Sequence, residues 1–309
     1  MRKIIAVATV TSALVLGLAA PAAAGSPTNV ILLPGATSAE SITAGEGGTF
    51  YAADLFQGTI YQGNVHTGTA AVFIRQPATT EIDGLTLDER DGLLFASGGT
   101  SGKAYVYNVR TRTLVATYNL GDPLTSQIND ATLTPFGVWF DDSTQPKLYF
   151  VPIVHGVPGP ERTLALSGPA AGAPGTFAIN DITSTPSGDT LLVAPATLGK
   201  LVTINPVTGT SKIVKGADIP ATDGILLDGR QLWATQWNKQ GNKQVSQVSR
   251  LRLSEDLSSA TLEKVITSPE FHAPLTSVRF GDRLGVVNSH IDTGFPPVSK
   301  TYEVVVLHD

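Results

Sequence analysis

Residues 179–195 read INDITSTPSGDTLLVAP, and residues 128–143 read INDATLTPFGVWFDDS. Each stretch begins with an isoleucine followed by a polar residue. A short apolar run, a turn at a glycine and a second apolar run follow. Short apolar runs bounded by Gly, Asp, Asn and Pro are typical of paired β-strands. The phrase therefore predicts a hairpin with a polar residue at the entrance of its first strand.

The same phrase recurs at residues 39–54, 82–98, 222–236 and 275–290, which makes six copies. The polar residues that lead the copies are Glu40, Asp83, Asn129, Asn180, Asp223 and Thr276. They are 43, 46, 51, 43 and 53 residues apart, and a propeller repeat takes roughly 40 to 50 residues. The sequence therefore predicts an all-β, six-bladed β-propeller with four-stranded blades. A two-sheet sandwich also has many short strands, but it does not require one phrase at a blade-sized period.

Two unpaired segments bear on how the ring closes. The apolar residues 29–33 precede the first copy, whereas the sixth copy is followed by a single further strand at residues 302–307. We expect residues 29–33 to complete the last blade, which would remove the open edges of a linear array.

The first 24 residues have the layout of a secretory signal. Arg2 and Lys3 precede an apolar run over residues 4–18, and small residues follow up to Ala24. The run is shorter than the roughly 20 residues of a membrane span. We predict cleavage after Ala24, secretion, no membrane association after cleavage, and a single propeller domain over residues 25–309.

Composition excludes several classes of protein. The chain has no cysteine, which excludes disulfides, thiolate metal sites and a lipidated cysteine. The mature chain retains 19 basic and 26 acidic residues, a net charge of −7, without a basic cluster. Nucleic acid is therefore a poor partner. We expect a monomer that acts on a small molecule.

The leading residues of the six copies have related chemistry. In a propeller the first strand of each blade lines the central channel, so these residues should form a ring at one mouth of the channel. Each offers a side-chain oxygen, and none is Lys, Arg or His. Oxygen ligands suit a hard divalent cation such as Ca²⁺, which would also relieve repulsion between crowded carboxylates. Asn and Asp are also common turn formers, but Glu40 gains nothing in that role.

At these residues the sequence resembles the SMP-30/gluconolactonase/luciferin-regenerating family of six-bladed propellers. In that family a Glu of the first blade, an Asn of the third, an Asn of the fourth and an Asp of the fifth hold one divalent metal. The resemblance carries these roles onto Glu40, Asn129, Asn180 and Asp223. It also implies that Asp223 acts as the general base in the hydrolysis of a lactone or a related small ester.

The sequence departs from the family pattern at three positions. Ser41 and Asp181 stand where the family usually has Gly after the ligand, and Gln127 stands where sugar-lactone-acting members often have Arg. The last difference weakens the case for an aldonolactone substrate more than it weakens the case for the metal.

Further residues are assigned to substrate contacts. They are Asp83 and Thr276 of the ring, Gln127, and Trp237, which we expect in a polar loop over residues 236–244. An insertion at residues 152–160 of the third blade is a candidate lid.

Two functions remain open at this point. The first is a secreted, metal-dependent hydrolase of lactones or small esters, for which Ca²⁺ is favoured and Mg²⁺, Mn²⁺ and Zn²⁺ are alternatives. The second is a non-catalytic propeller that binds a glycan, a peptide or a cell-wall component, because one fold serves many functions. The sequence contains no G-x-S-x-G, H-E-x-x-H or Gly-rich phosphate-loop motif.

Overall fold

The computed structural model describes residues 29–77, 80–240 and 243–309. The expected signal peptide, residues 1–24, and its cleavage point after Ala24 lie outside these residues. Within the described ranges, no helix is both long enough and apolar enough to cross a membrane.

The first three blades follow one another along the chain. Blade 1 contains β2 (Ile42–Ala44), β3 (Thr49–Ala53), β4 (Ile60–Asn64) and β5 (Thr69–Ile74). Blade 2 contains β6 (Leu85–Asp88), β7 (Leu93–Ser97), β8 (Lys103–Asn108) and β9 (Thr113–Asn119). Blade 3 contains β10 (Ile128–Thr134), β11 (Gly137–Asp142), β12 (Lys147–Val154), β14 (Arg162–Ala165) and the two-residue β13 (Val157–Pro158).

The second half of the chain repeats the pattern. Blade 4 contains β15 (Ile179–Ser184), β16 (Leu191–Pro195), β17 (Lys200–Ile204) and β18 (Ser211–Asp218). Blade 5 contains β19 (Thr222–Asp228), β20 (Gln231–Gln240), β21 (Lys243–Leu253) and β22 (Ala260–Ile266). Blade 6 contains β23 (Pro274–Phe280), β24 (Arg283–Asn288), β25 (Glu303–His308) and β1 (Asn29–Leu32). Three short 3₁₀ turns are η1 (Glu46–Gly48), η2 (Gly168–Ala170) and η3 (Ile291–Thr293).

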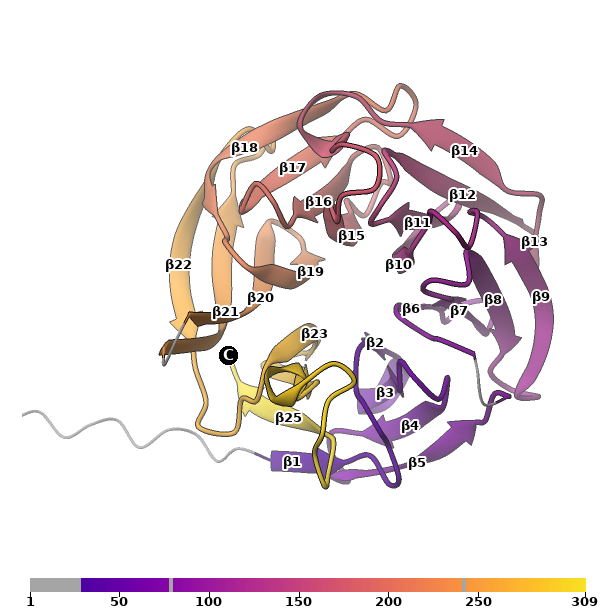
Figure 1. Ribbon diagram of the computed structural model, residues 1–309, viewed down its shortest axis with the longest axis vertical. Helices are drawn as coiled ribbons and strands as arrows, with labels where there is room; N and C mark the ends of the chain where they lie inside the picture. The colour runs from indigo at the N-terminus through magenta and orange to yellow at the C-terminus, as the bar shows by residue number, and fades with distance from the viewer. Residues whose placement is uncertain (1–28, 78–79, 241–242) are drawn as a thin grey trace, which may run out of the picture.

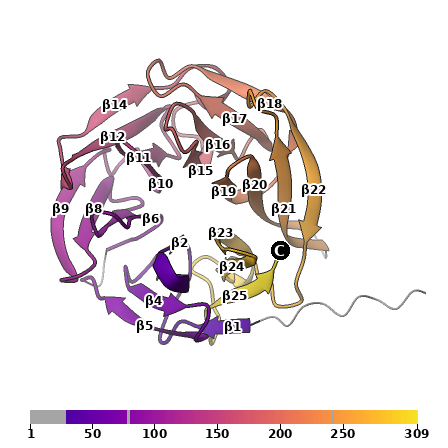
Figure 2. The ribbon, with the colours of Figure 1, turned by 180° about the vertical axis from the view of Figure 1, so that it is seen from behind.

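The six sheets are arranged as blades around a central axis (Figure 1). The innermost strands β2, β6, β10, β15, β19 and β23 surround the axis in the front view and in the view from behind (Figure 2). The fold is therefore the predicted six-bladed β-propeller. All six inner strands begin at the same end of the channel, which we call the mouth; the other end is the far end.

The ring closes in the way that the unpaired segments predict. β1 pairs with β25 in antiparallel register, from Asn29 opposite Val306 to Leu32 opposite Glu303. Ile31 is buried in an apolar cluster with residues of blade 1 such as Tyr61 and residues of blade 6 such as Val304. The first strand of the chain therefore completes the last blade.

Four inner strands share a bulge near the mouth. β10 pairs with β11 at Ile128 and again from Ala131, so Asn129 and Asp130 together lie opposite one residue of β11. β15, β19 and β23 shift register in the same way. Because a bulge interrupts the alternation of side chains along a strand, two neighbouring residues can both reach the axis.

The insertion in blade 3 lies away from the mouth. β12 runs from the mouth to the far end, and its last residues pair with β13, so the hairpin over residues 152–160 projects at the far end. The expectation that this insertion covers the mouth as a lid is wrong, because the direction of β12 places it on the opposite face.

Candidate functional site

Three of the four expected metal ligands are in contact at the mouth. Asn129 Nδ2 lies 3.4 Å from Asn180 Oδ1, and Asn180 Nδ2 donates to Asp223 Oδ1 at 2.6 Å. These residues come from β10, β15 and β19, which are the inner strands of three successive blades. The structure therefore brings together side chains that lie 51 and 43 residues apart in the sequence.

Glu40 faces this group from blade 1. It lies two residues before the start of β2, and no hydrogen bond is donated to its carboxylate within the described residues. Desolvation raises the pKa of Glu40 well above its usual range, and the charges of Asp223, Asp83 and Asp130 add to this effect. Glu40 is therefore a partly buried carboxyl group with three other carboxyl groups near it.

Asp83 and Gln127 are joined on the blade 2 side of the mouth. Gln127 Nε2 donates to Asp83 Oδ2 at 3.2 Å. Burial raises the pKa of Asp83 to about 8, the Gln127 hydrogen bond opposes this shift, and nearby carboxylates such as Glu81 and Asp223 reinforce it. The resembling family often has Arg at the position of Gln127. Here the side-chain amide donates a hydrogen bond to Asp83 without adding a positive charge.

Thr276 lies next to Glu40 but one position further along its strand than expected. Its hydroxyl donates to the Glu40 carbonyl oxygen at 3.1 Å, which links blade 6 to blade 1. The bulge of β23 contains Leu275 and Thr276, so Thr276 matches Asp130 of blade 3 and the apolar Leu275 matches Asn129. Five of the six leading residues therefore occupy equivalent positions in their blades, and Thr276 lies one residue further along its strand.

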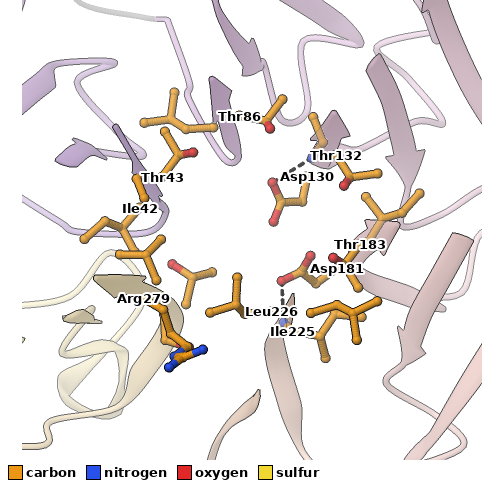
Figure 3. Close-up of a pocket in the computed structure, with 18 of the residues that line it drawn as sticks. Ile42, Thr43, Thr86, Asp130, Thr132, Asp181, Thr183, Ile225, Leu226 and Arg279 are labelled. Atoms are coloured by element: carbon orange, nitrogen blue, oxygen red, sulfur yellow. Dashed lines mark hydrogen bonds between the residues drawn. The ribbon is translucent and has the colours of Figure 1, made fainter. Parts of the chain in front are cut away.

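A second tier of carboxylates lies beneath the ring, and sequence reasoning missed it. Asp130 and Asp181 point into the central cavity from β10 and β15 (Figure 3). Burial raises the pKa of Asp130 to about 7. The pKa of Asp181 is raised well above its usual range, first by burial, then by the charge of Asp130 and by a hydrogen bond to it. The repeated tripeptide Ile-Asn-Asp at residues 128–130 and 179–181 was the available signal.

The cavity continues from this tier toward the far end. Its volume is about 340 Å³, and its walls include the hydroxyl side chains Thr43, Thr86, Thr132 and Thr183. Arg279 lies near the far end, where it forms an ion pair with Asp228. The carboxyl groups of Asp130 and Asp181 thus lie toward the mouth. The positive charge of Arg279 is paired with Asp228 at the far end.

The residues at the mouth fit a hard divalent cation by their chemistry. Asn129 Nδ2 donates to Ser143 Oγ at 2.8 Å, and Asn129 Oδ1 accepts no hydrogen bond in the described part of the chain. Both oxygens of Glu40 are likewise without donors there. Burial is the main cause of the raised pKa of Glu40, and a cation would offset the repulsion from neighbouring carboxylates that adds to it. Among the described residues, no group of three or more His, Cys, Asp or Glu side chains is arranged for a metal; the expected set contains two carboxylates and two amides.

Trp237 lies on a strand and not in the expected loop. β20 continues to Gln240 and pairs with β21 up to Gln240 opposite Lys243, so the polar segment is a long hairpin. Trp237 is partly buried and packs against the apolar cluster between blades 6 and 1. It therefore stands at the rim of the mouth over blades 5 and 6. The other two tryptophans, Trp139 and Trp233, are buried core residues.

His290 follows β24 of blade 6, and its contacts lie within that blade. Its Nε2 lies 2.8 Å from Glu303 Oε1, and its ring stacks on that of His272 with centroids 5.1 Å apart. Glu303 also accepts a hydrogen bond from Asn288 Nδ2. This group lies at the two middle strands of blade 6, and among the described residues it makes no hydrogen bond to the ring of leading residues.

Comparison with known proteins supports the fold. No protein-family model matches the sequence, and no curated protein matches it at a significant level. Among solved structures, the major allergen Mala s 1 of Malassezia sympodialis is 14% identical, with a TM-score of 0.66 over 91% of this chain and 95% of that chain. A luciferin-regenerating enzyme is 12% identical, with a TM-score of 0.62 over 89% of this chain and 92% of that chain. The WD40 repeats of RRP9 give a TM-score of 0.62 at 11% identity, over 94% of this chain and 99% of that chain. At these identities the similarity establishes the propeller fold alone.

Proposed function

We propose that this protein is a secreted, divalent-cation-dependent hydrolase of lactones or related small esters, similar in activity to the SMP-30/gluconolactonase/luciferin-regenerating family. The observation that carries the proposal is the contact of Asn129, Asn180 and Asp223 at the mouth, opposite the unpartnered carboxylate of Glu40. These ligand types occur in the blade order of that family, and a luciferin-regenerating enzyme has a similar fold.

Each of the four residues would supply an oxygen to the cation, with Ca²⁺ favoured by the donor set. Glu40 and Asp223 would supply the negative charge, and Asn129 and Asn180 would supply amide oxygens. The bound ion would polarise the ester carbonyl and lower the pKa of a neighbouring water molecule.

Asp223 is the proposed general base. Its Oδ1 accepts the Asn180 amide, so its Oδ2 is the atom that would take a proton from water. Burial raises the pKa of Asp223 to about 7, and a cation beside it would lower that value. A weakened base favours esters with low barriers to hydrolysis, and strained lactones are esters of this kind.

Four further residues would position the substrate. Asp83 and Gln127 border the blade 2 side of the ring, Thr276 lies beside Glu40, and Trp237 stands at the opposite rim. The broad face of Trp237 could pack on an apolar part of the ligand.

Metal analysis followed by a lactone panel with and without EDTA tests the proposal. We expect about one divalent ion per chain and hydrolysis that EDTA abolishes and Ca²⁺ restores. A stoichiometric ion without hydrolysis of any lactone would favour the binding module, and the absence of any bound ion would contradict the metal site.

Two substitutions connect the activity to the site. Asp223→Asn should abolish turnover, because the general base is lost. Glu40→Gln should weaken cation binding, because one of two ligand charges is lost. Glu161→Gln is the matched control, since Glu161 is exposed and precedes β14 at the far end. Full lactonase activity in Asp223→Asn would exclude the proposed mechanism.

A further inference from the structure

A second cleft opens on the mouth face beside the ring, over blades 2 to 4. Its volume is about 620 Å³. It is lined by Thr100, residues 123–127, Thr144, Gln145, Pro174 and Gly175. These residues belong to connections that precede or follow β7, β10, β11 and β15, and all of these connections lie at the mouth end. We call this depression the blade 3 cleft.

Hydrogen bonds hold the walls of the blade 3 cleft together. The Thr125 carbonyl oxygen accepts from Thr144 Oγ1 and from Gln145 Nε2, each at 2.7 Å. The Gly175 N–H donates to the Thr144 carbonyl oxygen at 2.8 Å. Three separate connections are thereby fixed to one another, so the cleft is a built feature of this face and suits a preorganised subsite.

Gln127 connects the cleft to the ring. It lines the cleft, and its Nε2 donates to Asp83 Oδ2. Asp83 in turn acts electrostatically on Glu40, the expected ligand from blade 1. Gln127 thus lines the blade 3 cleft and is hydrogen-bonded to a residue of the ring.

The lining of the cleft is uncharged and partly apolar. None of its residues is Lys, Arg, Asp or Glu, and Leu124 exposes 90% of its surface between two other lining residues, Pro123 and Thr125. The carboxylates that border the cleft accept hydrogen bonds from it: Asp122 from the Leu124 N–H, and Asp142 from the Gln127 N–H. Their negative charge would repel an anionic ligand group, whereas Leu124 and the prolines would contact an alkyl group.

We propose that the blade 3 cleft is the specificity subsite for the substrate and binds an uncharged, alkyl-like substituent of the ester. This inference rests on the proposed function for the location of the reacting group. It adds the class of substrate: a neutral lactone or ester with an aliphatic chain, in preference to a polyhydroxylated or carboxylated one.

The test compares substituents on one ring. The probes are γ-butyrolactone, γ-lactones with an unbranched alkyl chain of four to eight carbons, and the same lactones with a terminal carboxylate. We expect kcat/KM to rise with alkyl chain length and to fall when the chain ends in a carboxylate. A flat profile along this series would overturn the inference.

Leu124→Asp places a negative charge in the cleft at an exposed position where it does not disturb packing. It should lower kcat/KM for the longest alkyl lactone roughly tenfold, because the contact with several methylene groups is lost, and leave γ-butyrolactone unaffected. Val207→Asp is the control, since Val207 is 83% exposed and lies between β17 and β18 at the far end. Equal effects of the two substitutions would contradict a role for the cleft.

A binding measurement separates this inference from the proposed function. Calorimetric titration with the longest alkyl lactone, at a temperature and time where turnover is negligible, reports on the cleft without requiring hydrolysis. Weaker binding to Leu124→Asp than to Val207→Asp, in a protein that hydrolyses no lactone, would retain the subsite and exclude the enzyme. Hydrolysis together with unchanged binding in Leu124→Asp would retain the enzyme and exclude the subsite.

Discussion

A buried hydroxyl group holds the side chain of Asn129. Asn129 Nδ2 donates to Ser143 Oγ, and Ser143 is fully buried directly after β11. Because the amide nitrogen is engaged, the oxygen of the same amide is left as the ligand atom. Ser143 is thus a positioning residue for the proposed cation site, although it lies outside the ring.

We expect Ser143→Ala to lower the affinity for Ca²⁺ about tenfold, because partners that orient a ligand contribute about this much to metal binding. Calorimetric titration of the chelator-treated protein measures the effect. Ser97→Ala is the matched control: Ser97 is also fully buried, but its hydroxyl group has no hydrogen-bond partner within the described residues. Equal affinities of the two variants would show that the hydroxyl does not position the ligand.

Residues at the mouth differ in how well the sequence could predict them. Glu40, Asn129, Asn180 and Asp223 occur at the same point of a repeated phrase, so their common location followed from the repeat. Asp130 did not follow, because regular alternation puts neighbours on opposite sides of a strand, and only the bulge lets Asn129 and Asp130 both reach the axis. The same bulge explains why Thr276 was assigned one position too early.

At the scale of elements, three outer hairpins share one turn. Asn64, Asn108 and Asn205 each accept, at Oδ1, the N–H groups two and three residues further on. Two threonine hydroxyls then meet across each turn at 2.8 to 2.9 Å. The residue between these threonines has a positive φ, and in blades 1 and 4 it is Gly68 and Gly209. The turn repeats in the sequence, but it lies outside the phrase that identified the blades.

Substitution by alanine should lower the free energy of unfolding by different amounts at these two glycines. A Cβ at Gly68 would meet nothing within 4 Å, whereas a Cβ at Gly209 would lie 1.9 Å from the Ala165 carbonyl oxygen of the preceding blade. Gly68→Ala should lower the free energy of unfolding by about 1 kcal/mol, from the positive φ alone. Gly209→Ala should lower it by about 3 kcal/mol or more, since the backbone must also move. Denaturant unfolding measures both, and similar losses would contradict the role of the blade contact.

The lengths of the strands were harder to predict from the sequence than their positions. The repeat located every inner strand, because these strands are apolar and buried. The hairpin of β20 and β21 instead continues through polar residues beyond Trp237, where no burial pattern marks a strand. This part of the hairpin is defined by backbone hydrogen bonds, which leave no mark in the hydropathy pattern.

At the scale of the whole molecule, the carboxylates at the mouth determine how stability depends on pH. Burial raises the pKa of Asp83 to about 8 and the pKa values of Asp130 and Asp223 to about 7. In the unfolded chain these groups return to about 4. The folded protein without a cation therefore binds more protons than the unfolded chain between these values, so its stability decreases as pH rises.

We expect the melting temperature in EDTA to fall between pH 5 and pH 8. Saturating Ca²⁺ should raise it more at pH 8 than at pH 5, because protons compete with the cation for the same oxygens. Asp130→Asn should flatten the dependence in EDTA, since it removes one of the titrating groups. A melting temperature in EDTA that increases toward pH 8 would contradict this account.

The closure of the ring by β1 has a mechanical consequence. Asn29 of β1 lies opposite Val306, near the end of β25, so the outer ends of the two paired strands are at the same end of the pair. A force that pulls the chain apart at these ends opens the hydrogen bonds one after another, as a zipper opens, and does not load them all in shear. The contact that closes the ring is therefore loaded in its mechanically weaker direction when the chain is pulled at these two ends.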